Sequence, residues 1–242
     1  MESPSKLLLL LEAVRSIFEY GQSVVLNLPL QYISPKGDGH PVVIFPGLGT
    51  ADGSTHFVRT FLANIGYTVY PWGFGRNLGP RDGLDKLTAE LESRIRAISA
   101  AHGGAKVSLI GWSLGGIYAR EIAKIAPDVV RQVITLGTPF KGDPLATNAT
   151  MLYELLSKDK SHYNPAIIEA IARCPDVPFT SIYSKTDGVV SWKCSLEIET
   201  DQSENIEVPG ASHLGLGHNP ISMHIIANRL SQPELEWHPY KH

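Results

Sequence analysis

The feature that most constrains the fold of this chain is a regular alternation of short apolar runs with segments of helical periodicity. The runs are rich in β-branched residues, which predicts buried strands, and the segments between them repeat apolar residues every three or four positions, which predicts helices. This alternation favours an α/β fold with a mostly parallel sheet and helices on both faces. The length of 242 residues suits one such domain. The expected strands are 42–45, 67–70, 107–110, 129–136, 179–183 and 205–208, and the expected helices are 57–65, 84–98, 114–125 and 220–230.

One segment, 141–177, interrupts this alternation between two expected strands. Two clusters of apolar residues within it predict two short helices. An insertion at this point would lie over the carboxyl ends of the strands, where α/β proteins bind ligands. It is interpreted as a small helical lid, with a plain surface excursion as the alternative. The expected organisation is an N-terminal amphipathic helix and extended segment over 1–34, followed by an α/β domain over 35–242 that contains the insertion. The apolar clusters are Leu152, Leu155 and Leu156, and then Ile167, Ile168 and Ile171.

The N-terminal segment carries apolar residues on one face of a predicted helix. We expect that helix to dock on its own domain, with peripheral contact to a membrane surface as the alternative. Glu12 and Arg15 break the apolar run, no small-residue cleavage site follows, and no stretch reaches the roughly 20 apolar residues of a membrane span. These features predict a cytoplasmic protein, whereas the oligomeric state is not indicated. The residues of the apolar face are Leu7, Leu10, Leu11, Val14, Ile17 and Phe18.

The net charge of the chain is −3, which provides no basic field for nucleic acid. We therefore expect a small-molecule substrate as the partner and no nucleic acid.

A glycine-flanked serine follows the third expected strand directly. Gly111-Trp112-Ser113-Leu114-Gly115 matches the G-x-S-x-G pattern of a nucleophile elbow, in which a sharp strand-to-helix turn exposes the serine oxygen above the sheet. The pattern alone is weak evidence, because a chain with 22 glycines can match it by chance. Its context is more specific, since a strand precedes it and a helix follows. Ser113 is thus predicted to be a nucleophile, and a structural serine that caps the helix is the alternative.

A serine hydroxyl needs a base to take its proton, and the base needs an acid to orient it. In folds of this kind the chain order is serine, acid, histidine. Asp187 follows the fifth expected strand and His213 follows the sixth, so both should lie at the same sheet edge as Ser113. Asp176 and Asp201 are less suitable acids, because one precedes its strand and the other lies in a polar connection. His218 remains an alternative base.

Acyl transfer also requires hydrogen-bond donors for the oxyanion that forms on the carbonyl. One expected donor is the backbone N–H of Leu114, directly after the nucleophile. The second is the N–H of Leu48, in the loop after the first strand, because Gly47 and Gly49 permit an unusual backbone path there.

Nucleotide and metal sites are the competing interpretations of the same residues. Gly47, Gly49 and Gly53 loosely resemble a dinucleotide-binding turn, but the next expected strand does not end in the acidic residue that binds a ribose. No H-E-x-x-H pattern or other metal-ligand spacing occurs either. We therefore expect neither a metal nor another cofactor.

Together these motifs make the chain resemble a bacterial-type esterase or lipase of the α/β-hydrolase superfamily. The resemblance implies the fold, the triad of Ser113, Asp187 and His213, the two oxyanion donors and a cofactor-free mechanism. The chain departs from the pattern at Phe45-Pro46, where many such enzymes have His-Gly before the oxyanion loop. The matching motifs are Phe45-Pro46-Gly47-Leu48-Gly49, Gly75-Arg76-Asn77-Leu78-Gly79-Pro80, Gly111-Trp112-Ser113-Leu114-Gly115-Gly116, Thr135-Leu136-Gly137-Thr138-Pro139, Asp187-Gly188-Val189-Val190 and Ser212-His213-Leu214-Gly215.

The expected activity is hydrolysis of a carboxylic ester through an acyl-enzyme, with a role in lipid metabolism. A thioesterase, a lactonase or an acyltransferase would use the same triad, and a non-catalytic binding protein would use only the fold. Apolar side chains near the expected site favour an acyl or other hydrophobic group in the substrate. Those side chains are Trp72, Phe74, Trp112, Phe140, Leu152 and Leu155.

Overall fold

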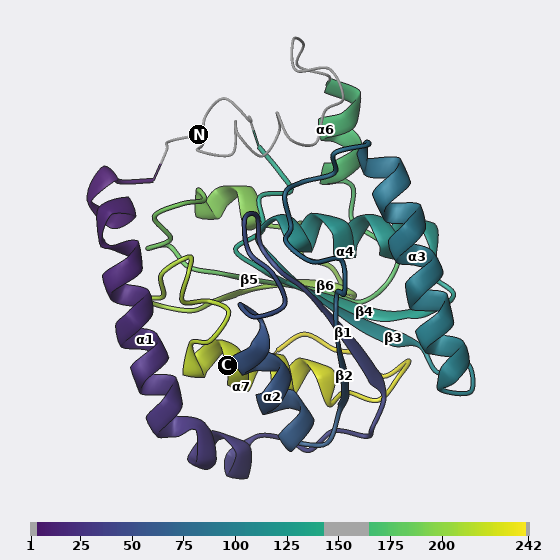
Figure 1. Ribbon diagram of the computed structural model, residues 1–242, viewed down its shortest axis with the longest axis horizontal. Coiled ribbons are helices and arrows are strands. Elements are labelled where there is room, and N and C mark those ends of the chain that lie inside the picture. Colours follow the sequence, from purple (N-terminus) through teal and green to yellow (C-terminus); the bar gives the residue numbers. More distant parts are fainter. Residues whose placement is uncertain (1–3, 143–164, 241–242) are drawn as a thin grey trace.

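The computed structural model describes residues 4–142 and 165–240, and a six-stranded parallel sheet lies at its centre (Figure 1). All six expected strands are confirmed, with ends that agree to within two residues. Every pair of neighbouring strands is parallel. Along the sheet the strands are β2 (Thr68–Pro71), β1 (Pro41–Phe45), β3 (Val107–Trp112), β4 (Val130–Leu136), β5 (Phe179–Tyr183) and β6 (Ser203–Glu207).

The strand order changes direction between β1 and β3. The chain runs from β1 outward to β2 and then returns across β1 to form β3 on its other side. Adjacent strands whose connections leave toward opposite sides open a crevice at their carboxyl ends, which is where α/β proteins bind ligands. The loop that contains Leu48 follows β1 and the turn that contains Ser113 follows β3, so both flank this crevice.

Helices cover both faces of the sheet and form a separate hydrophobic core on each face. Successive residues of a strand point to opposite faces, so Val42 and Ile44 belong to one core and Val43 and Phe45 to the other. The first core packs against α1 (Lys6–Ile33), α2 (His56–Asn64) and α7 (Pro220–Leu230), and the second against α3 (Leu84–Ala101), α4 (Leu114–Ile125) and α6 (Pro165–Ala172) (Figure 1).

Only part of the 141–177 insertion falls within the described residues. The second of its two expected helices is confirmed as α6, which packs against α4. The first, around Leu152, Leu155 and Leu156, lies outside them. A short 3-10 helix, η2 (Trp192–Ser195), follows β5 and was not predicted.

The N-terminal helix is longer than predicted. It continues through Pro29 to Ile33, so no extended segment occupies the end of this region. It docks on its own domain, beside α7 and α2, but through a polar face that contains the buried side chains of Glu12, Glu19 and Ser23. The apolar face points outward, with exposed fractions such as 78% at Leu10 and 73% at Ile17. None of the helices described has the length and apolarity needed to cross a bilayer.

Candidate active site

The turn from β3 into α4 places Ser113 in a conformation that few side chains adopt. Its φ is 53° and its ψ is −121°, and Leu235 is the other non-glycine residue with positive φ in the described parts of the chain. Such strain persists only where the surrounding structure enforces it. Here a Cβ at Gly111 would lie 2.2 Å from Cα of Gly116, and a Cβ at Gly115 would lie 2.4 Å from the carbonyl oxygen of Phe45. Both glycines are therefore required for the close packing of this turn.

Asp187 and His213 come together across the loops that follow β5 and β6. Nδ1 of His213 lies 2.6 Å from Oδ2 of Asp187, and both side chains are almost fully buried. The other carboxylate oxygen of Asp187 accepts hydrogen bonds from the backbone N–H groups of Val189, at 2.8 Å, and Val190, at 2.7 Å. These donors fix the orientation of the carboxylate toward the imidazole.

The pKa of His213 is raised above its usual value. Burial by itself would lower it, but the negative charge and hydrogen bond of Asp187, together with the charge of Glu12, outweigh the burial. An imidazolium at this position is therefore stabilised, as is needed by a base that holds a proton during a reaction.

His213 is also held against the turn that contains Ser113. The indole N–H of Trp112 donates to the backbone carbonyl of His213 over 3.1 Å. Among the described residues the Ser113 hydroxyl makes no hydrogen bond to the imidazole. Catalytic hydrogen bonds of this kind are often long until substrate binds.

His218, the alternative candidate for the base, faces the N-terminal helix instead. Its Nε2 lies 3.0 Å from the backbone carbonyl of Ser16, and its ring packs edge-on against Tyr20. Burial lowers the pKa of His218. No contact of the described residues joins it to Asp187, whereas His213 has that partner.

The loop after β1 lies directly against the serine turn. A Cβ at Gly47 would be 3.4 Å from Cβ of Ser113, which is van der Waals contact, so the loop packs against the serine. The N–H of Leu114 is at the first position of α4, where a helix offers it no backbone acceptor. Neither this N–H nor that of Leu48 donates to another described residue. Both groups therefore remain available to an oxygen at the crevice.

Asn77 supports this loop, and sequence reasoning did not identify it. Its side-chain amide donates to the carbonyl of Pro46 over 2.8 Å. Its backbone accepts from Gly49 N–H and donates to the carbonyl of Thr50, each at 2.7 Å. The Tyr118 hydroxyl donates to its side-chain oxygen, and Asn77 is fully buried. These bonds support the loop although Phe45-Pro46 replaces the usual His-Gly. The glycine-rich motif around Asn77 is recognisable in the sequence, but the sequence does not indicate that it binds the loop after β1.

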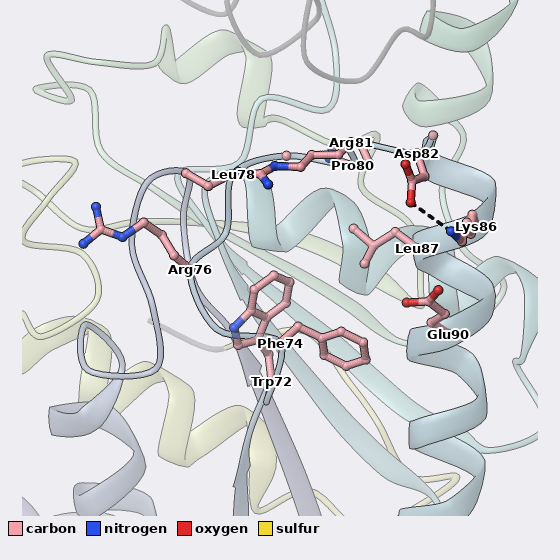
Figure 2. A pocket seen from close by; sticks show the side chains of 12 residues that line it. Trp72, Phe74, Arg76, Leu78, Pro80, Arg81, Asp82, Lys86, Leu87 and Glu90 are labelled. Carbon is pink, nitrogen blue, oxygen red and sulfur yellow. Dashed lines mark hydrogen bonds and ion pairs between the residues drawn. The ribbon is translucent and has the colours of Figure 1, made fainter.

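A pocket of about 390 Å³ adjoins the same glycine-rich segment (Figure 2). The rings of Trp72 and Phe74 lie side by side in it, with centroids 5.6 Å apart, and Leu87 of α3 lies across from them. The neighbours of Asn77 in the chain, Arg76 and Leu78, also line the pocket. The opposite rim is charged and includes an ion pair between Lys86 and Asp82 at 2.8 Å. The pocket thus combines an aromatic wall with a polar entrance.

The structure places the other expected pocket residues differently. Phe140 is 2% exposed and lies beneath the guanidinium of Arg120, 3.8 Å from its ring centroid, so it belongs to the core and not to this pocket. Trp112 is also a core residue, whose indole is occupied by its hydrogen bond to His213. Leu152 and Leu155 lie outside the described residues.

The chemistry available to these residues is proton transfer and nucleophilic attack. Within the described ranges, no three His, Cys, Asp or Glu side chains are grouped in a way that could hold a metal ion. The pair that is hydrogen-bonded to the serine turn, through Trp112, is instead Asp187 and His213.

Similar proteins include several lipases. The chain is 31% identical over 120 residues to a triacylglycerol lipase of Pseudarthrobacter phenanthrenivorans, covering 50% of this chain and 34% of that lipase. It is 26% identical over 180 residues to lipase B of Pseudozyma antarctica, covering 68% of this chain and 50% of that protein. It therefore spans between about a third and a half of the length of these relatives. A crystal structure of the lipase BlEst2 of Bacillus licheniformis shares the fold, with a TM-score of 0.61 at 17% identity over 83% of this chain and 95% of that one.

A family model covers the larger part of the α/β domain. Residues 39–197 match the model described as serine aminopeptidase, S33. The matched region begins just before β1 and extends past η2, so it contains Ser113 and Asp187 and ends before His213. This match covers more than half of the chain, and the parallel sheet and the serine turn have the arrangement of an α/β-hydrolase. The chain belongs to the serine aminopeptidase S33 family of α/β-hydrolases.

Proposed function

We propose that this protein is a serine hydrolase that cleaves carboxylic esters, with Ser113 as nucleophile, His213 as general base and Asp187 as the residue that orients the base. The observation that carries the proposal is the 2.6 Å contact between Asp187 and His213, together with the hydrogen bond that joins His213 to Trp112, the residue before a serine held at positive φ. A structural serine needs neither a strained backbone nor a buried acid and base at its side. A binding protein that had only kept the fold would not need all three residues.

The proposed reaction has two steps. In the first, His213 takes the Ser113 proton while the serine oxygen attacks the ester carbonyl, and His213 then gives that proton to the departing alcohol. In the second, His213 takes a proton from water, the resulting oxygen attacks the acyl-serine, and the carboxylic acid leaves as the proton returns to Ser113. Asp187 orients the imidazole throughout and stabilises the imidazolium.

The oxyanion of each tetrahedral intermediate would be bound by the N–H groups of Leu48 and Leu114. A well-aimed donor of this kind contributes on the order of 3 kcal/mol to stabilising the transition state. Two observations favour this assignment. Neither N–H group donates to another described residue, and Asn77 supports the loop after β1 that contains Leu48. Donors that are already oriented need no reorganisation when the charge develops.

The proposed substrate class is an ester with an apolar acyl group. The aromatic wall formed by Trp72 and Phe74 suits such a group, and the similar proteins described as triacylglycerol lipases act on esters by name. The family description names a peptidase, so cleavage of an amide is the alternative activity to be measured against cleavage of an ester. Thioesters and lactones present the same carbonyl chemistry with other leaving groups.

A series of p-nitrophenyl esters with increasing acyl length tests this proposal. We expect turnover that rises from acetyl to a longer chain, because the aromatic pocket contributes binding energy as apolar surface is buried, at about 0.8 kcal/mol per CH₂. Aminoacyl p-nitroanilides, an acyl thioester and a lactone are assayed in parallel. Faster cleavage of an anilide than of every ester would overturn the ester assignment, and a faster thioester or lactone would reassign the leaving group.

We also infer that the outward face of α1 contacts a lipid surface. The charged residues of the helix after Lys6 are Glu12, Arg15 and Glu19, and all three lie toward the domain. The solvent side of the helix is a mainly apolar stripe, with Gly21 and the polar Gln22 between an N-terminal and a C-terminal group of exposed apolar side chains. Interfacial helices insert such a stripe into the boundary between headgroups and acyl chains. A lipid surface would also supply the proposed substrate. The exposed stripe is Leu7, Leu10, Val14, Ile17, Phe18, Val25, Leu28 and Tyr32.

Sedimentation with phosphatidylcholine vesicles tests this contact. We expect the wild type to bind and the variants Leu10→Glu and Ile17→Glu each to bind about tenfold more weakly or worse, because an exposed apolar side chain loses roughly 1.5 kcal/mol or more of transfer free energy. Ser93→Glu, an exposed position on α3, controls for the added charge. If the wild type does not bind vesicles but forms a dimer that Leu10→Glu dissociates, the stripe is an interface between two copies of the protein instead.

A further inference from the structure

The inner face of α1 lies directly on the two loops that carry Asp187 and His213. A Cβ at Gly188 would lie 2.5 Å from the backbone of Leu8, and a Cβ at Gly215 would lie 2.2 Å from the carboxylate of Glu19. At Gly188 the obstacle is the backbone of α1, so only glycine fits there, and at Gly215 a larger residue would displace the carboxylate of Glu19. This close fit shows that α1 is part of the same packed unit as the Asp187–His213 pair.

Glu12 connects both loops through a single carboxylate. Its Oε1 accepts from the N–H of Gly188 at 2.7 Å and from the N–H of His213 at 3.1 Å. Its Oε2 accepts from the N–H of Leu214, also at 3.1 Å. Gly188 directly follows the proposed acid Asp187, His213 is the proposed base, and Leu214 directly follows it. One buried carboxylate therefore connects the backbones of the two loops.

Two further residues of the same face complete this connection. Arg15 lies 3.8 Å from Glu12 and donates to the carbonyl of Thr186 at 2.8 Å and to the carbonyl of Gly210 at 2.9 Å. Glu19 accepts from the N–H of Ser212 at 2.8 Å and from the side chain of Asn219. Glu19 holds the helix to the second loop only, whereas Glu12 bridges the two.

A buried carboxylate is costly unless hydrogen bonds compensate it. Glu12 is 3% exposed and receives three backbone N–H groups in return. A purely apolar contact would seat a helix at lower cost, so the carboxylate contributes something that packing alone does not. What it adds is directional contacts to the backbone of both catalytic loops and a negative charge beside the imidazole.

We propose that Glu12 is a positioning residue of the active site, which holds the loops of Asp187 and His213 at their working separation and adds a second negative charge beside the imidazole. This inference rests on the proposed function of that pair. It makes the N-terminal helix a component of the catalytic machinery, acting through His213, although the helix precedes the α/β domain in the chain.

The charge has a defined effect on the pH dependence. The charged groups that raise the pKa of His213 are Asp187, after β5, and Glu12, on α1. The other charged side chains of the inner face of α1 are Arg15 and Glu19. On the side of the serine turn, the contact to His213 comes from Trp112, which is uncharged. Because the base must be neutral, kcat/KM falls as the pH drops through the pKa of His213. Loss of the Glu12 charge lowers that pKa and moves the acid limb to lower pH.

The test compares Glu12→Gln with Glu19→Gln, a matched loss of a buried carboxylate on the same helix face. We expect Glu12→Gln to lower kcat by about 10- to 100-fold with little change in KM, as small misplacements of catalytic groups do. We also expect its acid limb to shift to lower pH. Glu19→Gln should keep the acid limb of the wild type. Thermal unfolding of both variants measures any common loss of stability.

Glu12→Asp separates the effect of the charge from that of side-chain length, since it keeps the carboxylate on a shorter side chain. We expect a lower kcat with an acid limb near that of the wild type. This variant also provides the test if Glu12→Gln does not fold. Glu12 variants whose kcat and pH profile match those of Glu19→Gln would overturn the inference and leave a structural role only. A wild type without esterase activity would instead overturn the proposed function.

Discussion

Replacement of Ser113 by alanine is expected to reduce kcat by about 10⁶-fold, the scale on which loss of a serine nucleophile acts. The remaining rate would come from binding and the oxyanion donors alone. The backbone should keep its conformation, because alanine retains the Cβ that serine has and the close contacts of Gly111 and Gly115 are unchanged. The variant should therefore unfold at nearly the temperature of the wild type, so its inactivity would be chemical.

Ester hydrolysis and labelling with a fluorophosphonate provide the measurements. The wild type should form a stoichiometric adduct that mass spectrometry of peptides assigns to Ser113. Ser108→Ala is a suitable control, because Ser108 is a fully buried serine on β3, the strand that leads to Ser113, and its hydroxyl contacts His40. That variant should be labelled like the wild type. Undiminished labelling or turnover in Ser113→Ala would falsify the assignment of the nucleophile.

The second large effect is expected from His213→Ala, with a loss of kcat approaching the same 10⁶-fold, because the nucleophile and its base act as one unit. Asp187 binds Nδ1 of the imidazole, which leaves Nε2 as the nitrogen that can serve the serine. The loss should be of kcat far more than of KM, since substrate binding uses other side chains. Steady-state kinetics at several pH values measures both parameters.

His218→Ala is the matched comparison for that variant, since His218 is also a buried histidine in the region after β6. It should retain most of the activity and lose some stability, because its ring contacts Ser16 and Tyr20 of α1 and not the serine turn. If His218→Ala abolished turnover while His213→Ala did not, the two histidines would exchange roles and the geometry around Asp187 would need another explanation.

The sequence alone was sufficient for the α/β framework. Alternation of apolar runs with helical segments is a local pattern, and all six strands of the sheet formed where it predicted them. The same pattern located Ser113, Asp187 and His213 after three strands. Because parallel strands end at one edge of a sheet, chain order was enough to expect these residues near each other, and Asp187 and His213 are in contact.

Other features depend on partners that are distant in the chain and could be found only in three dimensions. Asn77 looked like one residue of a glycine-rich loop, and its hydrogen bonds to the loop after β1 depend on how two connections meet above the sheet. Phe140 looked like a substrate contact because it is aromatic and follows a strand. The buried guanidinium of Arg120 against its ring places it in the core instead.

The N-terminal helix shows most clearly which features the sequence alone does not determine. Its sequence correctly predicted a helix with one apolar face, since periodicity is a local property. The sequence did not determine which face would dock. Glu12 and Glu19 turn inward because their carboxylates accept hydrogen bonds from backbone N–H groups 176 to 201 residues away in the chain. These donors compensate the buried charges, which leaves the apolar stripe outside. A pattern in the sequence defines the two faces of a helix, and only the tertiary contacts decide which of them meets the protein.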